Sequence, residues 1–257
     1  MVVGPGTVIA GFAGLALTKI FGPTLDLYGG DLKDYLINRK KDNFERICQN
    51  ATEKIGDEID NDGVVPPRVL EAIVSDGAVS DDPIWIEYFG GVLASSRTED
   101  GKDDRGARIG KIIGRLSVFQ IRAHYILYCA ARLKHLNVSV DPENGNDLVK
   151  LLTNLSSSNF MQLMGVQDET FLGHSIRGLS TENLIQDYIF GSEDFYSKQS
   201  KYENVSEGHQ ISFQMNATGV ELFMWATGNG LKPLRAFFDE NLDVGLVELN
   251  GCKIEPL

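Results

Sequence analysis

Cysteine is scarce in this sequence: among 257 residues only Cys48, Cys129 and Cys252 occur, and no two of them have a C-x-x-C spacing. An odd, scattered set predicts neither a disulfide framework nor a structural zinc site. Histidine is almost as scarce, with four residues, and the chain has no internal repeat. We therefore expect a protein of the reducing cytoplasm with no metal ion and no cofactor.

Positive charge is in short supply, because 24 Lys and Arg stand against 36 Asp and Glu, a formal net charge of −12. Such a chain binds nucleic acid through phosphates only where cations are concentrated locally. Residues 101–135 are one such concentration, with eight Lys or Arg and two acidic residues. Residues 136–257, by contrast, contain seven Lys or Arg and seventeen Asp or Glu. This asymmetry marks a partner surface, or two parts of the molecule that face each other or water.

The first 30 residues have no charge before Lys19 and only one acid, Asp26. The uncharged run approaches the roughly 20 residues that span a bilayer. However, no basic stretch precedes it, and its GPG start shortens the part that can be helical. We expect this Gly- and Ala-rich segment to pack in the core or at an interface, with membrane association through residues 1–22 as the alternative.

The spacing of apolar residues predicts helices through most of the chain up to residue 135. They are expected within residues 32–55, 66–77, 83–96, 106–116 and 117–136. Pro66 and Pro67 suit a first helical turn, and Asp82 before Pro83 suits an N-cap. Ser117, followed three residues later by Gln120, predicts a capping box.

After residue 136 the pattern loosens. Residues 146–155 and 180–190 are predicted to be helical, a strand is expected within 209–219, and short helices are expected within 220–230 and 234–242. The fold class that follows is mainly α, a multi-helix bundle with a small C-terminal α+β element. We predict three parts: an apolar segment over 1–30, a helical domain over 31–135 and an acidic α+β region over 136–257.

Several catalytic signatures are absent from the sequence. No histidine has an Arg five to seven residues before it, as the HEPN ribonucleases require. The stretch GHSIRG around Ser175 places its second glycine one residue too late for a serine hydrolase elbow. Neither a P-loop nor a dinucleotide fingerprint is present. His124 lies at the edge of an apolar helix face, which favours a structural, hydrogen-bonded histidine. We assign no catalytic residue.

The candidate interaction surface consists of charged residues in and around the basic segment. They are Arg97, Asp103, Asp104, Arg108, Lys111, Arg115 and Arg122. The acidic loop either binds a divalent cation or caps the following helix. The basic residues either contact phosphates or anionic lipid, or pair with the acidic C-terminal half.

Three segments carry a family resemblance: PPRVLEAIVSDGAVSDDPIWIEYFGGVLASSRTEDGKDDRG, IGRLSVFQIRAHYILY and TGVELFMWATGNG. Together they resemble the Abi-alpha proteins, a bacterial family linked to abortive infection, in which a phage-infected cell stops growing or dies. The resemblance implies an intracellular defence role and brings no catalytic residue. We expect an effector that acts on an unknown protein partner or a membrane surface, with homo-oligomers possible. The alternative is a nucleic-acid-binding protein or nuclease that uses residues 105–122.

Overall fold

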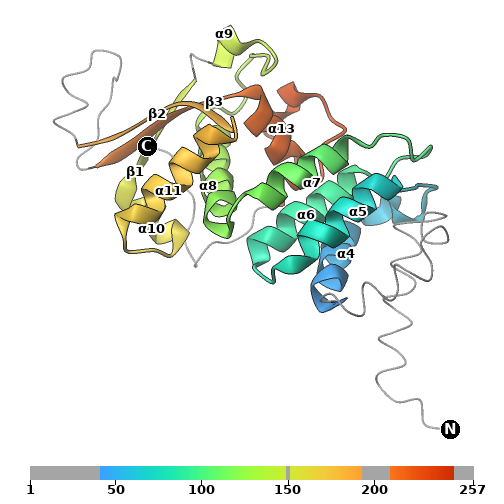
Figure 1. Cartoon of the computed structure of the whole chain (residues 1–257). Coiled ribbons are helices and arrows are strands. Elements are labelled where there is room, and N and C mark those ends of the chain that lie inside the picture. The colour runs from blue at the N-terminus through green and yellow to red at the C-terminus, as the bar shows by residue number, and fades with distance from the viewer. Residues whose placement is uncertain (1–40, 149–150, 193–208, 246–257) are drawn as a thin grey trace. The chain divides into compact units, whose positions relative to one another are not determined.

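The computed structural model describes residues 41–148, 151–192 and 209–245. Within them the protein is mainly α-helical, with one small antiparallel sheet in its C-terminal half, so the predicted fold class is confirmed (Figure 1). The chain forms two compact units: the first comprises Met1–Arg115 with Trp225–Leu231, and the second Leu116–Met224 with Lys232–Leu257. The boundary predicted after residue 135 falls inside the second unit, at the end of its longest described helix.

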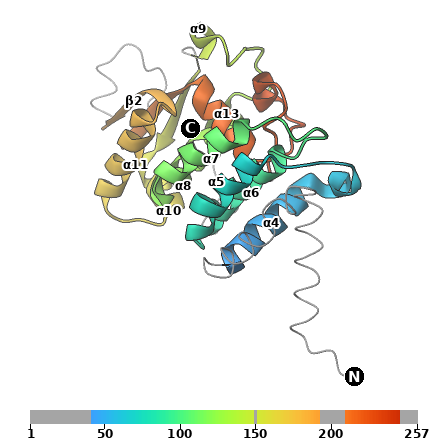
Figure 2. The same cartoon turned by 45° about the vertical axis from the view of Figure 1, so that its right-hand side comes forward.

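The first unit is a group of helices around one apolar helix. Its members are α4 (Lys41–Ile55), the 3₁₀ turn η1 (Gly56–Asp60), α5 (Pro67–Asp76), η2 (Gly77–Val79), α6 (Pro83–Ser95) and α7 (Arg105–Arg115). Every residue of α6 from Ile84 to Leu93 is buried, as expected for a helix that neighbours cover on all sides. The predicted cap is present, because Asp82 Oδ1 accepts a hydrogen bond from Ile84 N at 3.0 Å. Figure 2 shows α4, α5 and α7 around α6.

One buried ion pair joins α4 to α6. The Glu87 carboxylate accepts a hydrogen bond from Asn50 Nδ2 at 2.7 Å and a second from Lys54 Nζ. Both charged side chains are only 11% exposed. Since an unpaired charge in such a site is costly, this pair fixes how the two helices meet.

The second unit is built around α8 (Val118–Lys134), which begins at the predicted capping box of Ser117 and Gln120. Three strands, β1 (Leu152–Ser156), β2 (Ile185–Gly191) and β3 (Gln210–Met215), form a sheet in the order β1-β3-β2. The remaining helices are α9 (Gly145–Leu148), α10 (Ser157–Met164), α11 (Glu169–Thr181) and the first part of α13 (Ala217–Ala226); η3 (Leu234–Phe238) follows. Both partners of β3 run antiparallel to it.

Tyr128 of α8 is the centre of the second unit's core. Its hydroxyl donates to Leu184 O at 2.5 Å, and its ring contacts Phe213, Phe223 and Phe237. One turn earlier, His124 stacks on Tyr128 and hydrogen-bonds Gly219 O at 3.1 Å. His124 is therefore the structural residue that the sequence predicted.

Two of the predicted C-terminal helices are wrong. In the first range the described helix is α9, which ends at Leu148, and β1 begins at Leu152. In the second, α11 ends at Thr181, Asn183 takes a left-handed φ of 55°, and β2 follows. Pairing with β3 overrides the local helical preference of both segments, an effect of tertiary context that periodicity does not reveal. The strand predicted within 209–219 is confirmed as β3, and the helix after it as α13.

The segment over residues 1–30 lies outside the described residues, and so does its predicted membrane association. Over the part of the chain that the structure describes, no helix combines the length and the apolar character needed to cross a bilayer.

Candidate functional site

The predicted basic stripe is a row of exposed side chains on α7. Arg105, Arg108, Lys111 and Arg115 are all exposed, and they recur every three or four residues. Residues at that spacing share one side of a helix. The row therefore spans the length of α7, about 15 Å at 1.5 Å per residue.

The opposite side of α7 contains three glycines, which pack closely against neighbouring segments. Gly106, Gly110 and Gly114 alternate with the cationic row at intervals of four residues. A Cβ at Gly106 would lie 2.1 Å from Ser96 Oγ, one at Gly110 would lie 3.3 Å from the Ala72 Cβ, and one at Gly114 would lie 3.0 Å from the Asp76 Cβ. Because the glycines lack side chains, α7 packs directly against α5 and the end of α6. The cationic row consequently lies on a helix that is fixed in place by its packing.

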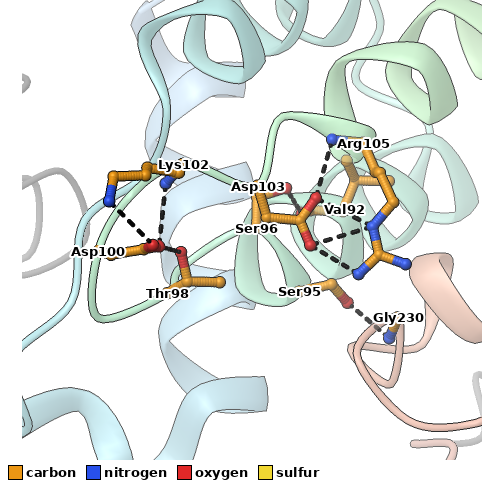
Figure 3. A network of polar contacts seen from close by, with 9 residues as sticks. All are labelled: Val92, Ser95, Ser96, Thr98, Asp100, Lys102, Asp103, Arg105 and Gly230. Carbon is orange, nitrogen blue, oxygen red and sulfur yellow. Dashed lines mark hydrogen bonds and ion pairs between the residues drawn. The ribbon is translucent and has the colours of Figure 1, made fainter.

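The start of α7 is fixed by Asp103 and Arg105 (Figure 3). Asp103 Oδ1 accepts from the Arg105 backbone N–H at 3.1 Å, and the carboxylate is held by the Arg105 guanidinium at 2.9 and 2.6 Å. These hydrogen bonds hold the pKa of Asp103 below its usual value. The same guanidinium lies 5.6 Å from the centre of the Trp225 ring. Asp103 thus caps α7, which is the capping interpretation of the acidic loop.

Carboxylates lie among the cations of this surface. Lys111 Nζ is 2.8 Å from Asp76 Oδ2, and Arg68 Nη1 is 2.9 Å from Asp104 Oδ2. Glu71, one turn after Arg68, is exposed on α5. We define the α5–α7 face as the set Arg68, Glu71, Asp76, Asp104, Arg108, Lys111 and Arg115. It is a mixed-charge surface rather than a uniformly basic one.

Two predicted residues lie elsewhere. Arg97 donates to Glu58 O and Ile59 O at 3.2 Å each, and also to Asn61 O, so it closes the end of η1. Arg122 belongs to the second unit, where it is half-buried and donates to Met164 O at 2.9 Å. Neither residue is part of the α5–α7 face. Both arginines bind backbone carbonyls that are remote in sequence. The sequence pattern does not reveal these carbonyls, and it therefore placed both residues in the candidate interaction surface.

Sequence reasoning missed Arg68, Glu71 and Asp76. A signal was present, because Arg68 and Glu71 are three residues apart on the polar side of an otherwise apolar helix. What the sequence lacked was any indication that this side lies beside α7.

The acidic loop and one Ser–His pair are the features that bear on the catalytic alternatives among the described residues. No group of three or more His, Cys, Asp or Glu side chains there could hold a metal ion. Asp100 accepts from Lys102 N at 3.1 Å and Thr98 Oγ1 at 3.4 Å, which makes a local turn. A Ser–His pair does occur, with Ser117 Oγ 3.3 Å from His174 Nε2. Ser117 Oγ also accepts the Gln120 N–H as the cap of α8, and that structural role accounts for it.

Comparison with protein-family models, with curated proteins and with solved structures found no match to this chain.

Proposed function

We propose that this protein is an antiphage defence protein of the abortive-infection type, and that it acts by binding another protein chain through the α5–α7 face rather than by catalysis. The defence role is supported by the resemblance of the three segments to the Abi-alpha proteins. The binding role is supported by one observation above all: the face carries charges of both signs on two tightly packed helices.

A mixed-charge face suits a protein partner. A protein can place carboxylates opposite Arg108 and Arg115 and basic side chains opposite Glu71 and Asp104, so that each charge meets its opposite. A nucleic-acid backbone offers phosphates alone, which the carboxylates of the face repel. This comparison favours protein binding over the alternative of a nucleic-acid binder or nuclease that uses residues 105–122.

The proposal is tested in bacteria that express the protein and are then challenged with phages. The variant R108E/R115E is compared with R177E/R235E, which reverses two exposed arginines in the second unit. We expect the first variant to lose protection and the second to keep it, at equal expression and equal melting temperature. Equal protection by both variants would show that the α5–α7 face is not required for the defence function. Protection by neither wild type nor variants against any phage would remove the defence role.

A separate experiment tests the alternative that the protein acts on a membrane through residues 1–22. A protein without residues 2–21 is expressed beside the full chain, and growth and membrane potential are recorded. Depolarisation by the full chain alone would favour action on the membrane through residues 1–22 and would contradict the proposal.

A further inference from the structure

The helices α5 and α7 run side by side in the same direction, and four contacts define which residues lie at the same level. Arg68, near the start of α5, pairs with Asp104, just before α7. Farther along, Ala72 meets Gly110, and Asp76 at the end of α5 contacts both Lys111 and Gly114. The two helices are therefore parallel, and residues that lie side by side differ by about 35 to 38 in residue number.

The two helices differ in the sign of the charge that they expose. Beyond the Arg68–Asp104 pair, the row on α7 contains Arg108, Lys111 and Arg115, whereas α5 contributes Glu71 and Asp76. A cationic row thus lies next to an anionic one. Glu71 follows Arg68 by three residues and Arg108 follows Asp104 by four, which puts these two exposed side chains at nearly the same level.

Two parallel rows of opposite charge are self-complementary. A two-fold axis that lies in the contact plane and runs parallel to both helices places α7 of one copy on α5 of a second copy, at the same level. We propose that the α5–α7 face is the interface between two copies of this chain, in which Arg108 of each copy meets Glu71 of the other, beside the Lys111–Asp76 ion pair that each copy makes within itself. This inference rests on the proposed function in that it assigns the partner of the same face.

The close packing of α7 strengthens this assignment. The contacts of Gly110 with Ala72 and of Gly114 with Asp76 keep α7 close to α5, so both rows are presented in one arrangement before association. Arginine, which supplies two of the three cations, matches carboxylates with two parallel hydrogen bonds. Exposed ion pairs are individually weak and are screened by salt, so we expect a weak, salt-sensitive dimer.

A charge-exchange experiment tests the inference with purified full-length protein. The variant R108E/R115E reverses two cations of the α7 row, and E71K reverses the exposed carboxylate of α5 that Arg108 of the second copy is proposed to meet. Self-association of wild type, of each variant and of an equimolar mixture is measured by sedimentation equilibrium at low and high salt. The control R177E/R235E reverses two arginines outside the face, and the milder variant R108Q/R115Q serves if a reversal affects folding, which circular dichroism monitors.

We expect wild type to dimerise, and each variant alone to dimerise about tenfold more weakly, a change of about 1.4 kcal/mol. The mixture should associate more tightly than either variant alone, because positions 108 and 71 of the two variants then carry opposite charges across both halves of the contact, and the control should match wild type. A monomeric wild type, or a mixture that associates no better than its components, overturns the inference. Binding of a DNA or RNA duplex in place of self-association also overturns it.

The outcomes separate this inference from the proposed function. If wild type is monomeric while R108E/R115E still loses protection, the face binds a different protein and only the dimer is refuted. If the dimer forms and both reversed variants still protect against phage, the dimer stands and the functional role of the face fails.

Discussion

A Cβ atom on Gly91 would lie 1.8 Å from the carbonyl oxygen of Ala226, a separation that two non-bonded atoms cannot adopt. Only glycine lets α6 approach the end of α13 this closely. Both residues belong to the first unit, so Trp225–Leu231, although late in the sequence, is an integral part of a unit built mostly from the first 115 residues.

The substitution Gly91→Ala should therefore be strongly destabilising. The obstacle is backbone rather than a flexible side chain, and overpacking of this kind costs about 1–3 kcal/mol or more. Urea unfolding at pH 7.5 measures the loss. The matched control is Gly173→Ala in α11, where the new Cβ lies 3.4 Å from the end of the Arg177 side chain, and alanine should be neutral or stabilising by up to about 1 kcal/mol. Equal effects at the two positions would show that the contact with Ala226 is not restrictive.

Stability should fall on mild acidification because of two histidines in the second unit. Burial lowers the pKa of His124 to about 3 and that of His135 to about 4, from an ordinary value of 6.5. Both are thus neutral in the folded protein at pH values where the unfolded chain already binds protons. The stability that they contribute is present above pH 6.5 and declines as the pH falls toward these folded-state values.

Unfolding free energies measured between pH 7.5 and 4 test this dependence. The slope that His124 contributes approaches about 1.4 kcal/mol per pH unit below pH 6. The variant His124→Gln should be less stable at pH 7.5, since it loses the stacking on Tyr128, but its stability should decline less steeply. Parallel curves for wild type and variant would contradict a neutral, buried His124.

Arg97→Lys should loosen the loop that precedes α5. Lysine cannot reach the three carbonyl groups that the Arg97 guanidinium binds, and each lost hydrogen bond to a charged donor costs about 1.5–3 kcal/mol at most, less where water replaces it. We expect faster amide hydrogen exchange around residues 58–64, measured by mass spectrometry. Arg68→Lys is the control, because Arg68 is 76% exposed and makes a single ion pair. Unchanged exchange in Arg97→Lys would mean that these contacts do not hold η1.

Glu87→Gln should cost about 3–5 kcal/mol, because it leaves the Lys54 charge buried without its carboxylate. The double variant K54M/E87Q removes that charge and should regain a large part of the loss, which a double-mutant cycle of urea unfolding would reveal. Additive losses in the double variant would indicate that Lys54 and Glu87 act independently.

The helices of the first 135 residues could be predicted from the sequence because their signals are local. Asp82 and Ser117 cap their helices as the sequence indicates, and the apolar character of α6 alone requires burial on every side. The strands β1 and β2 could not be predicted, since what makes them extended is pairing with β3, which begins only at Gln210, well after Ser156 and Gly191, where the two strands end. Periodicity within each segment contains no information about that partner.

The cations of the candidate site could be predicted from the sequence, but the carboxylates of α5 could not. Arg108, Lys111 and Arg115 stand out as a stripe on one helix, whereas Asp76 joins them only because Gly110 and Gly114 admit α5 at short range. The glycines were visible in the sequence, but their spacing does not say which helix they approach. The sequence therefore suggested a basic surface, and the structure adds the acidic residues that change the kind of partner it suits.

The glycine spacing of α7 also determines how this helix can evolve. A side chain at Gly106 or Gly110 would disturb the contacts of α7 with Ser96 and Ala72, whereas the exposed side chains of Arg108 and Arg115 lie away from those contacts. One helix thus combines a side on which packing restricts substitution with a side on which packing does not. In related chains the glycines of α7 should therefore stay in place even where its exposed positions differ.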